Sequence, residues 1–452
     1  MIDLLKKQQN RNKKLIALID GEHYPQVNLD AINLLKKYFT GNFEGIIFLG
    51  GTEKISGGDP GKFYGCRVFQ IGELDRDFPA ALDEFRPDFV YDLSDEPVVD
   101  YFKRMKIASF CFSRSSSYMG PDFYFEYEHK RIKLSRPSLM IIGTGKRIGK
   151  TAVSSYIAGL LSEKSKVCII AMGRGGPRVP RLIRTGSADI TPEFLLKMSR
   201  KGLHASSDYI EDALFTNADT VGCRRCGGGF GGRFFFSNIG RGVKIAEKTD
   251  PQIIVIEGSG ASVPPVDADR CICVVGANQD WQSIAGYLGI YRMLISDIIF
   301  LTMCEEPVAS DENILFLEKK IRQIKKDARI VKSVFRPRPL YSVKGKNIFL
   351  VITAGSLAGD IIKRHLETEY GCKVTGMSLN LSDRKKLYMD LKSSVNYDML
   401  LTELKAASVD MVTEFAFSEG KEINYLNNIP VITHGSSHIK NLLNRIRVGN
   451  EG

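Results

Sequence analysis

Short apolar runs alternate with segments of helical amphipathic spacing along most of the chain. At residues 27–39, apolar side chains recur three and four positions apart, which predicts a helix that buries one face. An alternation of buried strands with such helices predicts parallel sheets joined by right-handed crossovers, and therefore an α/β fold. The apolar runs that predict strands lie at residues 14–19, 46–49, 89–93, 166–172, 251–257, 270–275 and 297–302.

Changes in composition divide the chain into three predicted domains. Residues 124–136 are dense in charged and aromatic side chains, which is typical of a linker, and Arg336-Pro-Arg-Pro339 predicts a hinge. We expect Rossmann-like α/β units at 1–136 and 341–452 on either side of a central domain at 137–340. Within these domains we also expect one helix at 281–294 and strands at 347–353, 372–379, 409–412 and 430–433.

The composition is that of a folded protein from a reducing compartment. Apolar residues make up 43% of the 452 residues, which is enough for several packed cores. No apolar run approaches the roughly 18 residues that span a bilayer. The nine cysteines are scattered and odd in number, which argues against a disulfide framework. We therefore expect a cytoplasmic protein without a membrane partner.

The net charge of +11 favours anionic partners. The chain has no basic tail, no zinc-finger spacing and no stripe of interleaved basic and aromatic residues, so nucleic acid is not expected. Many arginines instead fall in glycine-rich segments that predict loops, where they could bind a small phosphate ester or simply cover a solvated surface. They are Arg174, Arg178, Arg181, Arg184, Arg224, Arg225, Arg233 and Arg241.

Residues 139–153 predict a phosphate-binding loop, or P-loop. An apolar strand leads into a glycine-punctuated turn, and Gly-Lys-Thr then opens an apolar helix. The N–H groups at the helix start would bind a polyphosphate, Lys150 would add a positive charge, and the Thr151 hydroxyl would bind Mg²⁺. The expected ligand is ATP with Mg²⁺, bound by Gly143, Thr144, Gly145, Lys146, Arg147, Ile148, Gly149, Lys150 and Thr151.

The spacing of this loop differs from the common pattern. Thr144 stands at the position of the usual first glycine, and five residues separate Gly143 from Gly149. This resembles the loop of the dethiobiotin synthetase branch of P-loop enzymes, which use ATP to activate small molecules. The alternative is an ordinary strand-to-helix turn that contains Gly-Lys-Thr.

Two further residues are expected at the same edge of the central sheet. Glu257 ends an apolar strand, where a carboxylate would hold Mg²⁺ together with Thr151; it could otherwise cap a helix. Arg174 follows another strand and could reach the phosphates of ATP or of the substrate, although a surface arginine in a turn is the alternative.

Three other segments have both a functional and a structural interpretation. Asp20-Gly-Glu-His23 could bind substrate, ligate a metal or supply an acid and a base, or it could be a capped turn. The glycine-rich segment 220–232 could approach an anion or form a lid, and its Cys223-Arg-Arg-Cys226 lacks a second ligand pair for a zinc site. Residues 353–358 could bind an anion, but an ordinary capped turn is more common.

Six longer motifs of the chain can be compared with known families. They are Leu18-Ile-Asp-Gly-Glu-His-Tyr-Pro25, Gly143-Thr-Gly-Lys-Arg-Ile-Gly-Lys-Thr151, Ala171-Met-Gly-Arg-Gly-Gly-Pro177, Ser207-Asp-Tyr-Ile-Glu-Asp-Ala213, Val221-Gly-Cys-Arg-Arg-Cys-Gly-Gly-Gly229 and Ile256-Glu-Gly-Ser-Gly-Ala261. Taken together, these motifs resemble the cyclic 2,3-diphosphoglycerate synthetases of methanogenic archaea. The resemblance implies an ATP- and Mg²⁺-dependent closure of 2,3-diphosphoglycerate to its cyclic pyrophosphate, with release of ADP and phosphate.

The resemblance also implies roles for individual residues. Thr151 and Glu257 would hold Mg²⁺, and the catalytic cations would be Lys146, Lys150 and Arg174. The substrate would be bound by Asp20, Glu22, His23, Arg174, Arg178, Arg224 and Arg225. A homodimer is a separate expectation that does not rest on the resemblance.

Two other functions stay open on the sequence. One is another ATP-dependent ligase of the dethiobiotin synthetase type that acts on a carboxylate or an amine. The other is a non-enzymatic ATP-dependent switch of the partition type that binds a partner. Loops of that type carry a lysine where Gly145 stands here, which disfavours the switch.

Overall fold

The computed structural model describes residues 12–50, 60–186 and 190–448, which form two compact units. The N-terminal unit contains the described residues up to Arg131 together with residues 280–295 and 320–326. The main unit contains the remaining described residues. Over the described ranges, no helix is long and apolar enough to cross a membrane.

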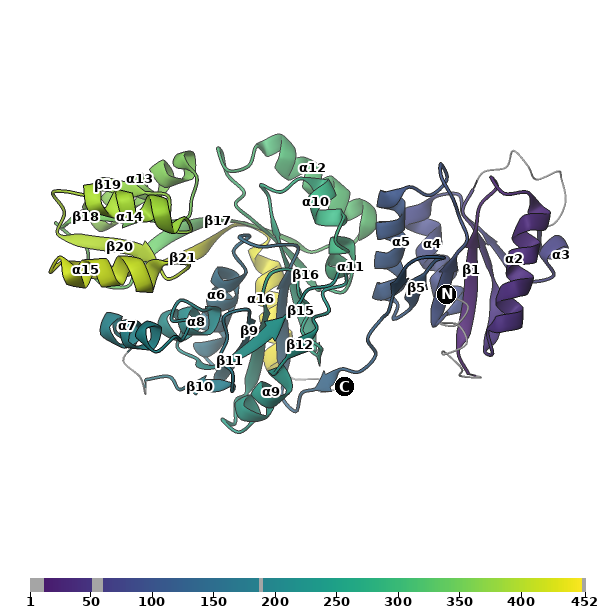
Figure 1. Ribbon diagram of the computed structural model, residues 1–452, viewed down its shortest axis with the longest axis horizontal. Helices are drawn as coiled ribbons and strands as arrows, with labels where there is room; N and C mark the ends of the chain where they lie inside the picture. Colours follow the sequence, from purple (N-terminus) through teal and green to yellow (C-terminus); the bar gives the residue numbers. More distant parts are fainter. Residues whose placement is uncertain (1–11, 51–59, 187–189, 449–452) are drawn as a thin grey trace. The chain divides into compact units, whose positions relative to one another are not determined.

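The N-terminal unit is built on a six-stranded sheet in the order β3-β2-β1-β4-β5-β6. All neighbours are parallel except β5 and β6, as the alternation of strands and helices predicts. Figure 1 shows α2 and α3 on one face of the sheet and α4 and α5 on the other. The bounds are β1 Lys14–Ile19, β2 Asn42–Phe48, β3 Val68–Gln70, β4 Phe89–Asp92, β5 Ser117–Met119, β6 Tyr124–Phe125, α2 Pro25–Tyr38, α3 Pro60–Tyr64, α4 Leu74–Phe85 and α5 Tyr101–Ser113.

Most of residues 281–294 are helical as predicted, but the prediction of one continuous helix is wrong, because the structure has two short helices there. The helices α10 (Trp281–Ala285) and α11 (Gly289–Leu294) are separated by Leu288, which has a left-handed φ of 52°. Both belong to the N-terminal unit, where the Tyr101 hydroxyl of α5 donates a hydrogen bond to the Gly286 carbonyl at 3.0 Å. The broken helix therefore completes the packing against α5.

The main unit contains one long sheet in the order β10-β11-β9-β13-β8-β15-β16-β17-β21-β20-β18-β19. The neighbours from β11 to β17 are all parallel, which confirms the predicted α/β architecture. The bounds in this part are β8 Ser138–Gly143, β9 Val167–Gly173, β10 Arg181–Ile183, β11 Asp219–Cys226, β12 Phe236–Ser237, β13 Ile253–Gly258, β15 Arg270–Gly276, β16 Ile298–Thr302 and β17 Ile330–Pro339; β7 (Ile132–Lys133) and β14 (Val266–Asp267) form a separate pair.

The expected hinge at 336–339 is wrong, since these residues end strand β17. This strand pairs antiparallel with β21 (Glu422–His434) and so joins the two parts of the sheet. The Leu340 N–H donates to the Tyr425 carbonyl at 2.9 Å. Because successive N–H groups of a strand point to opposite sides, the N–H groups of the even-numbered residues near the end of β17 point toward β21. The backbone nitrogens of Pro337 and Pro339 point the other way, toward the edge of β17 that β16 no longer pairs beyond Lys332. Proline has no N–H group to donate, and it is tolerated at these two positions because no strand partner needs a donor there.

The C-terminal strands form a parallel arrangement of their own, β21-β20-β18-β19. The strand expected at 409–412 is wrong: Ser408–Thr413 is a π-helix, and the strand lies earlier, at β20 (Met399–Glu403). Short apolar runs do not distinguish strand from helix, which explains the error. The other bounds are β18 Asn347–Val351, β19 Lys373–Ser378, α13 Ser356–Tyr370, α14 Arg384–Ser393 and α15 Glu414–Ser418.

The last helix of the chain packs on the core around the P-loop strand. Helix α16 (Ser436–Val448) contributes Leu442 and Leu443 to the buried cluster that contains Ile157 and Leu161 of α6 (Lys150–Ser162). Figure 1 shows α16 in yellow beside these central elements. The division into domains at 136/137 and 340/341 stays a prediction. The remaining helices are α7 Pro192–Arg200, α8 Asp208–Phe215, α9 Ile239–Glu247 and α12 Asp311–Ile324.

We expect Phe300→Ala to lower the free energy of unfolding by about 3–5 kcal/mol, because Phe300 on β16 is fully buried in this core. Chemical denaturation would measure the change. Phe235→Ala is the matched control: its ring is 94% exposed, and its replacement should change the free energy by no more than about 0.5 kcal/mol. Equal effects of the two substitutions would contradict this description of the core.

Candidate active site

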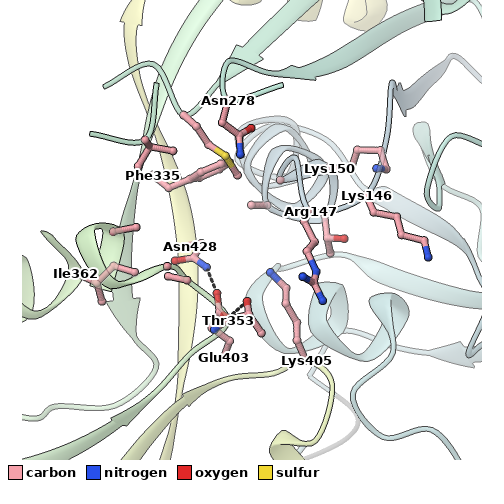
Figure 2. A pocket seen from close by; sticks show the side chains of 18 of the residues that line it. Lys146, Arg147, Lys150, Asn278, Phe335, Thr353, Ile362, Glu403, Lys405 and Asn428 are labelled. Carbon is pink, nitrogen blue, oxygen red and sulfur yellow. Dashed lines mark hydrogen bonds between the residues drawn. The ribbon is translucent and has the colours of Figure 1, made fainter. Parts of the chain in front are cut away.

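A cavity of about 620 Å³ in the main unit contains the predicted nucleotide site. The P-loop and the ends of β9 and β13 line one side, and residues that follow β18 and β20 line the other. Figure 2 shows Lys146, Arg147 and Lys150 of the P-loop together with Thr353, Glu403 and Lys405 from the C-terminal strands. The cavity therefore combines segments that are far apart in the sequence.

The P-loop has the geometry that its glycines predict. A Cβ atom at Gly143 would lie 2.8 Å from Ile148 Cδ1 and 2.9 Å from the Val274 carbonyl oxygen, so a side chain does not fit there. Gly149 precedes helix α6 with a left-handed φ of 82°. Lys150, the first residue of α6, is 7% exposed, and its ammonium donates to the Gly145 carbonyl.

Other residues of the predicted loop anchor it or face the cavity. The Thr144 hydroxyl donates to Gln279 Oε1 at 2.9 Å, which gives the unusual residue at the first-glycine position a structural role. The Ile148 side chain is buried in the core. Lys146 and Arg147 are exposed and line the cavity. The loop is thus anchored through Thr144 and Ile148, and it presents the two cations Lys146 and Arg147 to a ligand.

The environment of Lys150 makes its charge sensitive to pH. Burial lowers the pKa of its ammonium to about 8, although the nearby Glu257 carboxylate opposes this shift. A polyphosphate at the loop would favour the charged form and raise the pKa again. Nucleotide binding is therefore expected to be coupled to the protonation of Lys150.

Glu257 lies beside the P-loop, as its place at the end of β13 predicts. Its Oε1 accepts a hydrogen bond from the Thr151 hydroxyl at 2.7 Å, so the two predicted metal ligands are in contact. The carboxylate is 2% exposed, and its Oε2 has no hydrogen-bond donor among the described residues. A buried carboxylate oxygen without a donor is costly unless a proton or a cation compensates it.

Asp212 of α8 forms a buried pair with Glu257. Its Oδ1 accepts from the Ser155 hydroxyl at 2.8 Å, and its Oδ2 also has no donor in the described structure. Burial raises the pKa of Asp212 to about 8, and burial together with the Asp212 charge raises the pKa of Glu257 well above its usual range. A proton held between the two carboxyls would satisfy both oxygens, and a divalent cation could replace it.

These donors fit Mg²⁺ bound with a nucleotide. Magnesium takes one or two protein oxygens and completes its shell with phosphate and water oxygens. Thr151 and Glu257 can supply such a pair. No cluster of three or more His, Cys, Asp or Glu side chains suited to a metal occurs in the part of the chain that the structure describes. A metal held by protein side chains alone is therefore not indicated there.

The structure brings only one of the four predicted substrate arginines into the cavity lining. Arg174 is exposed at the cavity, whereas Arg178 is exposed outside the lining residues. Arg224 and Arg225 were expected in a loop, and this is wrong because both lie on β11. Arg224 Nε donates to the Gly176 carbonyl at 3.0 Å, and Arg225 Nη2 donates to the Ser259 carbonyl at 2.6 Å. Both side chains thus support loops that border the cavity.

Asp20, Glu22 and His23 belong to the N-terminal unit, at the carboxyl end of β1. Asp20 is fully buried and accepts hydrogen bonds from the N–H groups of Glu22 at 3.0 Å and His23 at 3.2 Å. The His23 ring lies 2.9 Å from the same oxygen, through Nδ1. Asp20 therefore organises this turn, and substrate binding by the three residues stays a prediction.

The two cysteines of Cys223-Arg-Arg-Cys226 lie on strand β11, where side chains three positions apart point to opposite faces. Cys223 is buried and Cys226 is exposed, and neither forms a disulfide. This geometry favours a structural role over a shared metal or a redox pair.

Sequence reasoning missed the other side of the cavity. Glu403 is the last residue of β20, a strand that the hydrophobic pattern did not reveal, and Lys405 follows it. Asn428 lies on β21. The residues at 353–355 do line the cavity, although the sequence favoured an ordinary turn. An acidic residue at the end of an apolar strand was the available signal at Glu403, as it was at Glu257.

Family models match three consecutive parts of the chain. They describe the N-terminal domain, the P-loop domain and the C-terminal domain of cyclic 2,3-diphosphoglycerate synthetase, at residues 14–126, 138–334 and 339–429. Among solved structures, LpxK from Aquifex aeolicus in complex with ATP matches with a TM-score of 0.44 and 13% identity over 76% of this chain and 96% of that chain. This similarity is too low to support a functional argument.

Curated relatives match over nearly the whole length. The cyclic 2,3-diphosphoglycerate synthetase of Methanothermus fervidus is 44% identical over 93% of both chains. That of Rubrobacter xylanophilus is 43% identical over 92% of this chain and 94% of its own, and that of Thermococcus onnurineus is 44% identical over 95% and 97%. With all three family models matched in order, the chain belongs to the cyclic 2,3-diphosphoglycerate synthetase family.

Proposed function

We propose that this protein is an enzyme that uses ATP to close 2,3-diphosphoglycerate to cyclic 2,3-diphosphoglycerate, with release of ADP and phosphate. The observation that carries the proposal is a P-loop that opens on a cavity lined by cations from several segments, in a chain of this family. A substrate with two phosphate groups requires such neutralisation, because the groups repel each other when they approach. The cations are Lys146, Arg147, Lys150, Arg174 and Lys405.

The reaction proceeds in two displacements. An oxygen of one substrate phosphate bonds to the γ-phosphorus of ATP while the bond from that phosphorus to the β,γ-bridging oxygen breaks, and ADP leaves. An oxygen of the other substrate phosphate then bonds to the substrate phosphorus that carries the transferred group. The bond from that phosphorus to the oxygen that bridges it to the transferred group breaks, and inorganic phosphate leaves. The second pKa of a phosphate monoester is about 6, so the attacking oxygens are ionised and no protein base has to remove a proton.

The residues of the cavity supply position and charge for these displacements. Lys150 and Lys146 stabilise charge on the β- and γ-phosphates, and Arg174 lies at the edge where the substrate phosphate would meet them. Thr151 and Glu257 would hold Mg²⁺, which neutralises phosphate charge when it is bound.

The remaining parts of the proposal concern substrate contacts and setting. Asp20, Glu22 and His23 from the N-terminal unit, with Arg178, Arg224 and Arg225, are kept as substrate-binding residues that variants can test. The protein is proposed to act in the cytoplasm as a homodimer on a small molecule, without nucleic acid.

Phosphorus NMR tests the function directly. Incubation with ATP, Mg²⁺ and 2,3-diphosphoglycerate should give a new pyrophosphate signal, together with ADP and phosphate, only when all three are present. A ligase of the dethiobiotin synthetase type would instead consume ATP with a carboxylate or an amine, and a partition-type switch would show ATP-dependent binding to a macromolecule. If protein that binds ATP forms no cyclic product, the proposed function is wrong.

A further inference from the structure

The carboxyl ends of the C-terminal strands β18 and β20 border the P-loop cavity. Strand β18 is flanked by β19 on one side and by β20 on the other, and all three are parallel. The chain leaves β18 through α13 toward β19, so the direction of winding reverses between β18 and β20. In open α/β sheets, ligands bind in the crevice outside the carboxyl ends of the strands at such a point. Thr353 and Glu403 mark this crevice, and both line the cavity.

The carboxylate of Glu403 is committed to protein donors. Its Oε2 accepts from the Thr353 N–H at 3.0 Å and from the Thr353 hydroxyl at 2.7 Å. Its Oε1 accepts from Asn428 Nδ2 at 2.6 Å. Figure 2 shows these bonds between Thr353, Glu403 and Asn428. Glu403 therefore fixes the two strand ends in place and is not available to a ligand as a free carboxylate.

Lys405, two residues after Glu403, presents its ammonium to the cavity. The Lys405 side chain extends toward the space in front of the P-loop, as does that of Arg147 (Figure 2). Its Nζ lies 3.6 Å from Glu211 Oε1, an ion pair longer than a hydrogen bond. Burial acts to lower the pKa of Lys405, but the charges of Glu211 and Glu403 outweigh it and raise the pKa. The ammonium is therefore charged at neutral pH.

We propose that Lys405 and the β18–α13 turn bind one phosphate group of the substrate, while the other phosphate faces the γ-phosphate of ATP at the P-loop. This inference rests on the proposed function and names the residues that orient its substrate. The N–H groups at the start of α13, whose N-cap Gly355 has no side-chain cap, add donors to the same turn. A bisphosphate held in this way spans the cavity from the C-terminal strands to the P-loop.

Gly355 offers a test in which only charge differs between two variants. Its φ is −70°, and a Cβ atom there would meet no atom within 4 Å, so a side chain is accommodated. Asp and Asn are equally good N-cap residues, and both Gly355→Asp and Gly355→Asn should fold. We expect Gly355→Asp to raise the KM for 2,3-diphosphoglycerate about tenfold or more relative to Gly355→Asn, because of repulsion between the new carboxylate and the phosphate. The KM for ATP should be the same in both variants.

Lys405 variants test the cation itself. Lys405→Gln should weaken binding of 2,3-diphosphoglycerate, measured by calorimetry with ADP present, about tenfold or more, and Lys405→Arg should restore most of it. Lys385→Gln, on the exposed face of α14, is the matched control and should bind as wild type. Thermal unfolding checks that each variant is folded.

Two results would overturn the inference. One is unchanged affinity for 2,3-diphosphoglycerate in folded Lys405→Gln together with equal KM values in the two Gly355 variants. The other is an equal loss of affinity for ATP and for 2,3-diphosphoglycerate. The proposed function fails separately, when wild-type protein forms no cyclic product, so the calorimetric and NMR results distinguish the two failures.

Discussion

Lys150→Ala is expected to lower kcat/KM by at least about 10²–10³-fold and to weaken ATP binding at the same time. Lys150 is the buried cation at the start of α6, where the helix N–H groups would bind the β- and γ-phosphates, whereas the other two cations of the loop, Lys146 and Arg147, are exposed. Steady-state kinetics and calorimetric titration with ATP would measure the two effects. Lys164→Ala, an exposed lysine just after the other end of α6, is the matched control and should leave both unchanged.

The same lysine predicts a pH dependence of nucleotide affinity. With a pKa of about 8 in the free protein, the ammonium is mostly charged below pH 8 and mostly neutral above it. Phosphates favour the charged form, so the Kd for ATP should rise about tenfold from pH 7 to pH 9. Lys150→Arg keeps its charge throughout this range and should lose the dependence. A Kd for ATP that is equally pH-dependent in Lys150→Arg would assign the effect to another group.

The sequence was sufficient where local pattern determines structure. The apolar runs located many of the parallel strands of both units, and the glycine spacing located the P-loop with Glu257 beside it. Each of these features depends on a strand, a turn and a helix that are consecutive in the chain or on a residue at the end of a core strand. Such features are recognisable without knowledge of distant contacts.

The sequence was insufficient where the site depends on which strands become neighbours. Lys405 and Glu403 reach the P-loop cavity only because β17 pairs antiparallel with β21, and the Arg-Pro repeat of β17 is typical of a break in structure. The roles of Arg224 and Arg225 were likewise unclear from the sequence, since their glycine-rich surroundings indicated a loop although both residues lie on β11. Tertiary pairing therefore decided the half of the cavity that local signals could not assign.

The two sides of the cavity carry different kinds of residues, which suit different ligands. The P-loop side carries the features that suit a nucleotide and its metal: backbone donors, a buried lysine and an acidic pair. The opposite side carries a lysine next to a carboxylate that the protein itself satisfies. Substitutions on the two sides should therefore have different effects. Those on the P-loop side should change the binding of ATP and the metal, and those on the opposite side should change the binding of the second anion.

Glu257→Gln is expected to remove most activity, with a loss of about 100-fold or more, while binding of ATP measured without Mg²⁺ stays nearly unchanged. The amide oxygen can still accept the hydrogen bond from Thr151, so the loop should keep its shape, but the charge that would hold the metal is gone. The loss should be greatest at limiting Mg²⁺, and binding of Mn²⁺ in the presence of ADP, measured by electron paramagnetic resonance, should weaken in parallel. Glu163→Gln, at the exposed end of α6, is the control and should behave as wild type. Full activity of Glu257→Gln at limiting Mg²⁺ would show that Glu257 is not a metal ligand and that its buried pairing with Asp212 serves only the fold.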